Sequence, residues 1–432
     1  MSATIRTIDR PRIPAGQLTA VLVGNALEFY DFLTYAFFAV QIGQAFFPAA
    51  NPTSSLLASL ATFGAGFLMR PIGAFVIGRM GDRVGRKPAM VLSFSCMGFA
   101  MVGLALTPSY AAIGVAAPIL VIAFRLLQGF ALGGDVGPTT AYLIEAAPLE
   151  RRGFYASLQV ASQGAAILLA GVIGVLLART LDPQVLHDWG WRIAFLLGTI
   201  IVPFGLVIRR RLPETLDHDA ADAPSPGSAR AHRRLVLLGL GMLGSSTILT
   251  YVLAYLNTFA TTTLHMQLDV AFGATVIMGL CDVCLAPVSG WLSDRYGRKP
   301  VMMIPWLLLF ALVTPAFVLI TRLGTPAALL GAAAVLAILR SLGTAPIIAA
   351  LTEALPARVR SGSLALTYAL AVATFGGTAQ FMVAWLIAAT GSPLAPAWYV
   401  LTALGCGLIA MALMHETAPV RAMPAGLIPA AG

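Results

Sequence analysis

The stretch Gly78-Arg-Met-Gly-Asp-Arg-Val-Gly-Arg-Lys-Pro88 connects two long apolar segments, and the chain contains it twice. The second copy, Gly290-Trp-Leu-Ser-Asp-Arg-Tyr-Gly-Arg-Lys-Pro300, lies 212 residues further along. A charged loop that recurs between apolar segments at one long offset indicates a membrane protein built from two parallel repeats. Both repeats are then expected to begin on the same side of the bilayer.

A second set of landmarks supports this duplication. A Glu, a Pro and an Arg that follow the first loop recur after the second at a common offset of 208 residues: Glu145, Pro148 and Arg152 against Glu353, Pro356 and Arg360. The halves also end alike, with Glu214-Thr215 in the first and Glu416-Thr417 in the second. Landmarks in one order at nearly one spacing predict that the two halves share one topology.

The composition excludes a water-soluble globule. Of the 432 residues, 10% are charged and 58% are hydrophobic, and the mean hydropathy is +0.86. Soluble proteins carry about a quarter charged residues, so the solvent of this chain is expected to be a lipid bilayer. The net charge of +9 does not indicate a nucleic-acid partner, because the basic residues lie in loops between apolar segments.

Twelve apolar segments are expected to span the bilayer, since a spanning helix needs roughly 20 apolar residues. They lie at about 18–47, 55–78, 88–107, 111–142, 154–178, 191–208, 235–261, 269–292, 300–320, 327–350, 361–389 and 397–414. The predicted fold is therefore an all-α polytopic membrane protein with two pseudo-symmetric six-helix bundles. The predicted divisions are an N-terminal tail (1–17), a first bundle (18–208), an interdomain loop (209–234), a second bundle (235–414) and a C-terminal tail (415–432).

The distribution of basic residues predicts the orientation. Lys and Arg gather in the loops on the side of both termini, and the opposite loops offer little beyond Arg179, Arg192 and Arg322. Short cytoplasmic loops carry the excess of Lys and Arg, so both termini are expected in the cytoplasm, with the protein in the cell inner membrane. The first 17 residues are polar and lack a small-residue cleavage site, so no cleavable signal peptide is expected.

No cofactor, metal site or enzyme activity is expected. Cys281 and Cys284 form a C-x-x-C, but they lie inside an apolar segment without a second pair, which favours a packing role. The five histidines are scattered, and the chain contains neither H-x-x-E-H, nor G-x-S-x-G, nor the ATP-binding pattern G-x-x-x-x-G-K-[ST]. A transport activity of this chain would therefore have to use an ion gradient.

The landmarks resemble those of the major facilitator superfamily over the whole chain. The duplicated loop is its most specific motif, and Arg125-Leu-Leu-Gln-Gly129 resembles its R-x-x-Q-G motif. A narrower likeness to the metabolite–proton symporter family is carried by Gly24-Asn-Ala-Leu-Glu-Phe-Tyr-Asp-Phe32 and Gly66-Phe-Leu-Met-Arg-Pro-Ile-Gly73. Within that family, the stretch from Ala349 to Gly377 is more similar to the citrate and tricarballylate carriers than to the betaine or shikimate carriers.

Two residues depart from the family pattern. In Gly133-Gly-Asp-Val-Gly-Pro138 the acid is Asp135, where the family usually has Glu followed by an aromatic residue. Arg340, in the tenth expected helix, is not part of the pattern of the citrate carriers. Both departures concern the identity of the substrate and leave the predicted fold unchanged.

The resemblance implies the major facilitator fold and proton-coupled symport by alternating access, with citrate or a related tricarboxylate as the expected substrate. Alternatives within the family are a dicarboxylate, a shikimate-like acid, or betaine and proline, although three arginines inside the membrane argue against a zwitterion. Remote alternatives are a polytopic membrane enzyme and a transporter-like sensor. The expected partners are a small organic anion, protons and lipid, and the protein is expected to be a monomer.

Charged residues at bilayer depth are functional candidates by default, because each is costly without a partner or a cavity. Arg70 lies 12 residues before Asp82, and Asp282 lies 12 before Asp294. These two sites are equivalent in the repeats but opposite in charge, and each is roughly 18 Å from its loop. The resemblance places their helices at the central cavity, so Arg70 is expected to bind a substrate carboxylate and Asp282 to balance or gate it. The alternative is a static pair.

A citrate-like anion needs several donors, and Arg binds carboxylates bidentately. Arg70, Arg125 and Arg340 are the intramembrane arginines available for this role. Neutral polar residues are further candidates for substrate binding, each with a helix–helix hydrogen bond as its alternative role: Asn25, Tyr30, Tyr35, Gln128, Gln163, Tyr255, Asn257 and Gln380.

The expected proton carriers are Glu28, Asp31 and Asp135, with Asp282 as a further coupling candidate. Glu28 and Asp31 are three residues apart and share one helix face. Near Arg125, burial favours the neutral acid while the cation favours the carboxylate, and a group balanced in this way can load and release a proton. The alternative is that Asp31 and Arg125 form a structural pair.

The resemblance implies that the loop motifs form a cytoplasmic gate. The Asp of each loop is expected at a helix end, where it holds neighbouring helices together in the outward-open state, and each Glu is expected near the Arg that follows it. The predicted gate residues are Asp82, Arg86, Glu145 and Arg152 in the first half, and Asp294, Arg298, Glu353 and Arg360 in the second.

Overall fold

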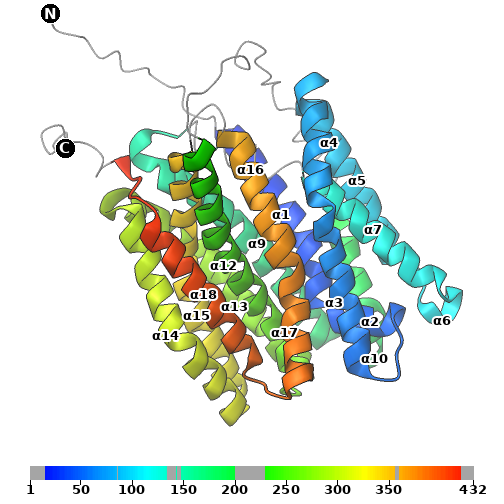
Figure 1. Ribbon diagram of the computed structural model, residues 1–432. Coiled ribbons are helices and arrows are strands. Elements are labelled where there is room, and N and C mark those ends of the chain that lie inside the picture. Colours follow the sequence, from blue (N-terminus) through cyan, green and yellow to red (C-terminus); the bar gives the residue numbers. More distant parts are fainter. Residues whose placement is uncertain are drawn as a thin grey trace, which may run out of the picture.

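A computed structural model describes residues 15–84, 86–133, 143, 147–199, 229–355 and 360–419. Within these residues every regular element is a helix, and the long helices lie side by side in a bundle (Figure 1). The all-α fold predicted from the sequence is therefore confirmed.

The first half contains short and long helices. They are α1 (Ala15–Phe37), α2 (Ala39–Phe46), α3 (Pro52–Leu68), α4 (Arg70–Arg83), α5 (Arg86–Leu106), α6 (Tyr110–Ile113), α7 (Ala116–Gly133), the 3-10 helix η1 (Leu149–Arg151), α9 (Arg152–Thr180), α10 (Pro183–Val185), the π-helix η2 (Leu186–Gly190) and helical residues 191–199.

The second half is more continuous. It contains α12 (Ala229–Thr262), α13 (Leu268–Tyr296), α14 (Arg298–Leu323), α15 (Pro326–Ala354), α16 (Arg360–Ala371), the π-helix η4 (Val372–Gly376), α17 (Gly377–Thr390) and α18 (Ala395–Leu413). Among the described residues, nine helices are long and apolar enough to cross a membrane by length and composition.

Two expected helices are interrupted where the site is built. The segment expected at 55–78 divides at Met69 into α3 and α4. Pro71 lies in the first turn of α4, where its missing N–H is tolerated, whereas in a continuous helix it would break the ladder. The segment expected at 361–389 contains η4, and π-helical turns are frequent at functional sites. α12 already begins at Ala229, inside the stretch predicted as a loop.

The outer surface is apolar, as lipid contact requires. Large hydrophobic side chains such as Leu68, Phe99 and Leu307 are more than half exposed. Buried charged side chains, in contrast, include Asp31, Arg125 and others inside the bundle. Since a soluble protein rarely exposes large contiguous apolar patches, this distribution agrees with a multi-pass membrane protein.

The two halves meet most extensively along α9 and α13. Glycines make the contact close: a Cβ atom at Gly164 would lie 2.3 Å from the Cβ of Asp282, and one at Gly279 would lie 2.3 Å from the backbone N of Leu168. Small residues allow membrane helices to approach in this way. The α9–α13 interface therefore sets the distance between the halves beside Asp282.

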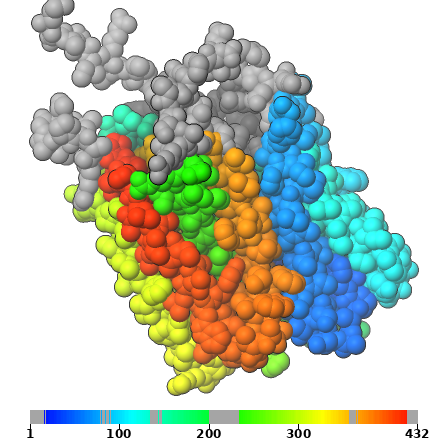
Figure 2. Space-filling model, viewed as in Figure 1, coloured from blue at the N-terminus to red at the C-terminus, as the bar shows by residue number. Residues whose placement is uncertain are grey.

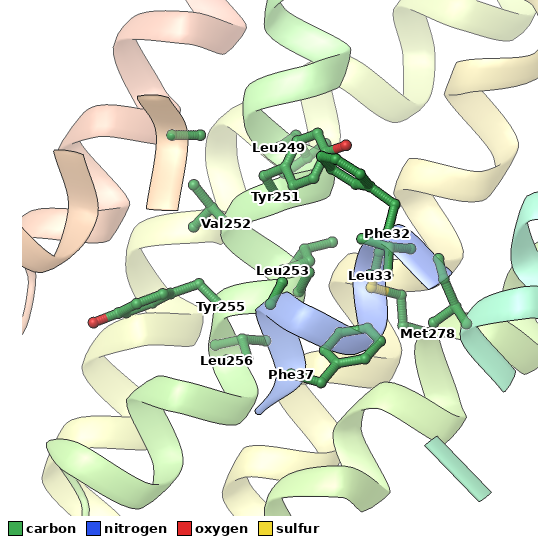
Figure 3. Close-up of a cluster of buried hydrophobic side chains, with 14 of the residues drawn as sticks. Phe32, Leu33, Phe37, Leu249, Tyr251, Val252, Leu253, Tyr255, Leu256 and Met278 are labelled. Carbon is green, nitrogen blue, oxygen red and sulfur yellow. The ribbon is translucent and has the colours of Figure 1, made fainter. Parts of the chain in front are cut away.

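Two further contacts join the halves. α3 packs on α17, where a Cβ at Gly64 would lie 2.4 Å from the carbonyl oxygen of Gly377, and Figure 2 shows the blue and orange segments meeting along this seam. α1 packs on α12, with Phe37 beside Leu253 and Leu256 (Figure 3).

Replacing Gly164 by Ala is expected to lower transport roughly tenfold, because the added methyl group collides with Asp282 and overpacking costs about 1–3 kcal/mol. The matched control is Gly331→Ala in α15, where a Cβ would meet nothing within 4 Å. Uptake into proteoliposomes and thermal unfolding in detergent measure both effects. Equal behaviour of the two variants would show that the α9–α13 contact is not limiting.

Candidate substrate and proton site

A small cavity lies between the two halves. Its volume is about 60 Å³, which has room for only a few water molecules, since one needs roughly 10–15 Å³ by this measure. The wall is formed by α1 and α9 from the first half and by α12, α13, α15, α16 and η4 from the second. Its polar or charged lining residues are Gln163, Ser246, Thr247, Thr250, Tyr251, Asp282, Arg340, Thr344 and Tyr368.

Asp282 and Arg340 form a buried ion pair on the wall of this cavity. Arg340 Nη2 contacts Asp282 Oδ2, and both side chains are at most 3% exposed. Ser341 Oγ donates a 2.5 Å hydrogen bond to Asp282 Oδ1, and Arg340 Nη1 donates to Thr250 Oγ1 at 3.2 Å. The sequence predicts that Asp282 balances or gates Arg70, with a static pair of the two as the alternative. The structure instead pairs Asp282 with Arg340, because α15 packs beside α13.

A second charged cluster lies in the first half, with Gln128 at its centre. The Nε2 of Gln128 donates to both carboxylate oxygens of Asp31, at 2.9 and 2.8 Å. Its Oε1 accepts a 2.7 Å hydrogen bond from Arg125 Nη1. The predicted proximity of Asp31 and Arg125 is therefore present, but the amide of Gln128 connects them. A donor toward Asp31 and an acceptor toward Arg125 suit an ionised carboxylate.

Aromatic rings hold the two arginines of the first half. The guanidinium carbons of Arg70 and Arg125 lie 4.6 and 4.3 Å from the centre of the Phe32 ring. Arg70 also lies over Phe67 at 4.3 Å, and Arg125 over Tyr35 at 4.5 Å. Cation–π contacts are attractive but leave hydrogen-bond donors free, and within the described residues the Nε of each arginine has no hydrogen-bond partner.

Two tyrosines connect this cluster to the cavity, and the sequence did not identify them. Tyr251 and Tyr368 line the cavity, and both interact electrostatically with Arg70. Tyr251 also packs edge-on against Phe67, at 5.5 Å between ring centres. Arg70 itself does not line the cavity, so its interactions with these two tyrosines are its connection to the cavity wall. Their position in the apolar α12 and α16 gives no signal in the sequence.

Several predicted polar ligands instead make helix–helix hydrogen bonds. Asn25 donates to Ser162 Oγ at 2.7 Å, and Tyr30 donates to the carbonyl of Ala194 at 2.8 Å. Two others are placed in the same way: Asn257 Nδ2 donates to Phe37 O at 3.5 Å and Gln380 Nε2 donates to Tyr251 O at 3.3 Å.

The remaining predicted ligands differ in their access to the cavity. Tyr255 is buried and its ring points away from α1 (Figure 3). Gln163, in contrast, lines the cavity beside Tyr368.

At one end of the bundle, Asp294 joins the two halves. Its Oδ1 and Oδ2 accept hydrogen bonds from the backbone N–H groups of Gly153 and Phe154, at 2.8 and 2.9 Å. These groups begin α9, where four N–H groups lack helical partners and the helix dipole favours an anion. Arg298 Nη1 also contacts Asp294 Oδ1 at 2.7 Å. A carboxylate of α13 thus caps a helix of the other half.

Arg298 also organises the second half at this end. It binds Glu353 through two hydrogen bonds, Nε to Oε2 at 3.1 Å and Nη2 to Oε1 at 2.9 Å. The sequence predicts Arg360 as the neighbour of Glu353, and the side chain of Arg360 lies outside the described residues. Within them, the bidentate partner of Glu353 is Arg298, at the start of α14. Thr417 Oγ1 donates to Glu353 Oε2 at 3.0 Å.

Glu416, a repeat landmark with no predicted role, closes the same network. Its carboxylate accepts from the backbone N–H groups of Arg298 and Lys299, at 2.9 and 3.0 Å, and from those of Thr417 and Ala418. Partial burial alone would raise the pKa of Glu416, but the four backbone donors outweigh it and lower the pKa below its usual range. The ionised side chain therefore ties the end of α18 to the first turn of α14.

Other predicted site residues are only partly placed. Glu28 is buried in α1 and interacts with Arg70, and Arg152 is half-buried at the start of α9. Asp135 and Glu145 lie outside the described residues. The side chains of three more predicted gate residues are outside them as well: Asp82 of α4, Arg86 of α5 and Arg360 of α16.

Known proteins share this sequence pattern and this fold. The family model "Sugar (and other) transporter" matches residues 17–218. The structure of a proton:xylose symporter of the major facilitator superfamily superposes with a TM-score of 0.76 at 16% identity, covering 93% of this chain and 96% of that one. This similarity shows the fold.

Curated relatives are closer in sequence. A citrate-proton symporter of Klebsiella pneumoniae is 37% identical over 94% of this chain and 93% of its own length. An alpha-ketoglutarate permease of Escherichia coli strain K12 is 33% identical over 91% of this chain and 92% of its own. Both are transporters that match nearly end to end. This chain therefore belongs to the major facilitator superfamily, in its metabolite–proton symporter family.

Proposed function

We propose that this protein is a proton-coupled symporter that imports citrate or a related tricarboxylate by alternating access. The observation that carries the proposal is the cavity between the halves, in which a buried arginine and a buried carboxylate face the same small space. A cation there suits a carboxylate substrate, and a carboxylate there suits a proton. The similarity to a citrate-proton symporter supports this choice of substrate.

In this proposal the arginines Arg70, Arg125 and Arg340 bind substrate carboxylates. In the structure they form two groups, with Arg340 on the cavity wall and the other two around the Phe32 ring, beside Tyr251. A substrate with several carboxylates can engage both groups, whereas a monocarboxylate can engage one. Gln163 is placed to add a neutral hydrogen bond.

The carboxylates of the first half are proposed proton carriers. Asp31 has the connection to Arg125 that the role needs, through Gln128. Glu28 lies on the same face of α1 and interacts with Arg70. Asp135 retains its proposed role from the sequence.

The network around Asp294 and Arg298 is proposed as the cytoplasmic gate, in its closed form. Both termini are proposed to lie on that side, in keeping with the positive-inside distribution of Lys and Arg. At the opposite end, Arg179 Nε and Asp269 Oδ2 approach to 3.3 Å across the halves, so the structure has contacts between the halves at both ends. We propose that it represents an occluded state.

We propose further that the protein is not an enzyme, uses the proton as its coupling ion without a cofactor or metal, and acts as a monomer in the inner membrane. Its division into two bundles, the first at residues 18–208 and the second from the start of α12 at Ala229 to residue 414, is part of the same proposal. The citrate-proton symporter and the alpha-ketoglutarate permease are both transporters, which supports this proposal.

Uptake of labelled citrate into proteoliposomes under an inward proton gradient tests the function. Citrate should accumulate, and an uncoupler that collapses the gradient should abolish accumulation. Unlabelled tricarballylate, alpha-ketoglutarate, shikimate and betaine should be added as competitors. A dicarboxylate transporter is the second candidate, favoured by the similarity to the alpha-ketoglutarate permease; competition and uptake by alpha-ketoglutarate alone would establish it instead.

A further inference from the structure

The ion pair on the cavity wall leaves part of Arg340 unused. Asp282 contacts Nη2 through one oxygen, Oδ2, while its other oxygen accepts from Ser341. Nη1 is taken by Thr250. Within the described residues the buried Nε of Arg340 has no hydrogen-bond partner. A guanidinium can bind both oxygens of one carboxylate with two parallel N–H groups, here those of Nη2 and Nε. Of these two, Nε has no acceptor within the described residues.

The surroundings of the pair contain little other charge. Of the described residues that line the cavity, Arg340 is the single permanent cation. The titratable groups that face it are Tyr251 from α12 and Tyr368 from α16, together with Cys281, which interacts with Asp282 from its own helix. α1 contributes apolar side chains and α9 the neutral Gln163. Protonation of Asp282 is therefore the change that most alters the charge of this wall.

We propose that Asp282 occupies the place of a substrate carboxylate on Arg340, and that protonation of Asp282 opens this place. The proposal rests on the function proposed above. The proton binds Oδ2, which breaks the ionic contact with Arg340 Nη2. Ser341 continues to donate to Oδ1, now the carbonyl oxygen of a neutral acid. A carboxylate of the substrate then binds Nη2 and Nε together.

Charge balance makes the two events depend on each other. With Asp282 ionised, an added substrate carboxylate would place two negative charges around one arginine in a space that holds few waters, which is strongly unfavourable. With Asp282 protonated, the substrate carboxylate and Arg340 form a neutral pair. After the cavity opens inward, Asp282 releases its proton to the cytoplasm. The ionised Asp282 then re-forms its ion pair with Arg340 and displaces the substrate carboxylate. One proton therefore accompanies each carboxylate bound at this place.

The test compares Asp282→Asn, which imitates the neutral acid, with Asp182→Asn in the exposed segment between α9 and α10. Citrate affinity is measured by calorimetry on the purified full chain at pH 6 and pH 8. Wild type and Asp182→Asn should bind citrate more tightly at pH 6 by the same factor. For Asp282→Asn, the ratio of the citrate affinities at pH 6 and pH 8 should be about tenfold smaller than for wild type. Ionisation of citrate itself is common to all variants and cancels in this comparison.

Transport separates binding from coupling. Asp282→Asn should exchange labelled for unlabelled citrate across the membrane but fail to accumulate citrate under a proton gradient. Arg340→Gln should weaken citrate binding about tenfold or more at both pH values. A structural role for the pair would lower exchange and accumulation together, so the split between them is the diagnostic readout.

If Asp282→Asn accumulates citrate and keeps the wild-type pH factor, the inference is overturned while the proposed function stands. If wild type shows no proton-driven citrate uptake, the proposed function fails. Should Asp282→Asn not fold, the double variant Asp282→Asn/Arg340→Gln, which buries no lone charge, decides the point. It should bind citrate about tenfold more weakly than wild type at pH 6, and wild-type affinity with wild-type pH dependence would refute the inference.

Discussion

Replacement of Arg125 by Met is expected to abolish proton-driven uptake and to destabilise the protein by about 3–5 kcal/mol, the usual cost of leaving a buried charge without its partner. Arg125 is 0% exposed. It lies over Phe32 and Tyr35, and its Nη1 donates to Gln128. Without it, the ionised Asp31 would keep the Gln128 amide as a neutral partner in a low-dielectric surrounding. A drop in thermal unfolding temperature in detergent measures the loss.

The double variant Arg125→Met/Asp31→Asn separates stability from function. It removes both charges, so the unfolding temperature should recover most of the loss, while uptake should remain absent. Arg322→Met, at the exposed end of α14, is the matched control and should leave both quantities unchanged. If the double variant is no more stable than Arg125→Met, Arg125 does not stabilise the carboxylate of Asp31. The connection through Gln128 then contributes nothing to the stability of the protein.

The sequence predicts which segments are helices and which charged residues lie inside the membrane. It predicts less well which side chains those charged residues contact. Composition and the duplicated loop suffice for an all-α membrane fold, because both depend on patterns along the chain. The loop motif also indicates Asp294 and Arg298 as gate residues, and the two are in contact although Gly297 separates their helices, α13 and α14. Gln128, in contrast, lies 97 residues from Asp31, and its position depends on how α7 packs against α1.

The same limit explains the contacts that the sequence did not predict. Asp282 and Arg70 are equivalent positions of the two repeats, which says nothing about contact, and α15 brings Arg340 to Asp282 instead. The repeat also gave no indication that Arg298 would bind Glu353 from α14. Tyr251 and Tyr368 lie in apolar helices without any pattern that marks them. Partner choice in a bundle depends on helix packing, which one sequence does not specify.

Replacing Asp294 by Asn is expected to open the gate network and to lower uptake by about ten- to a hundredfold. Asp294 accepts hydrogen bonds from the first N–H groups of α9 with both oxygens and also binds Arg298. Asn offers one oxygen, turns an amide donor toward a backbone donor, and removes the charge that the helix dipole favours. Hydrogen bonds to charged groups contribute about 1.5–3 kcal/mol, and about 1.4 kcal/mol changes a population tenfold.

The opening can be observed directly at Ser157, which is 0% exposed in α9 and lies against Gly290 of α13. A Ser157→Cys substitution should react slowly with a maleimide in the otherwise unchanged protein and about tenfold faster when Asp294→Asn is added, since that change favours the state in which α9 and α13 separate. Labelling is read peptide by peptide, so the native cysteines serve as internal references. Asp182→Asn, the same change in the exposed segment between α9 and α10, should leave the rate unaltered. Equal rates with and without Asp294→Asn would mean that this carboxylate does not hold the two halves together.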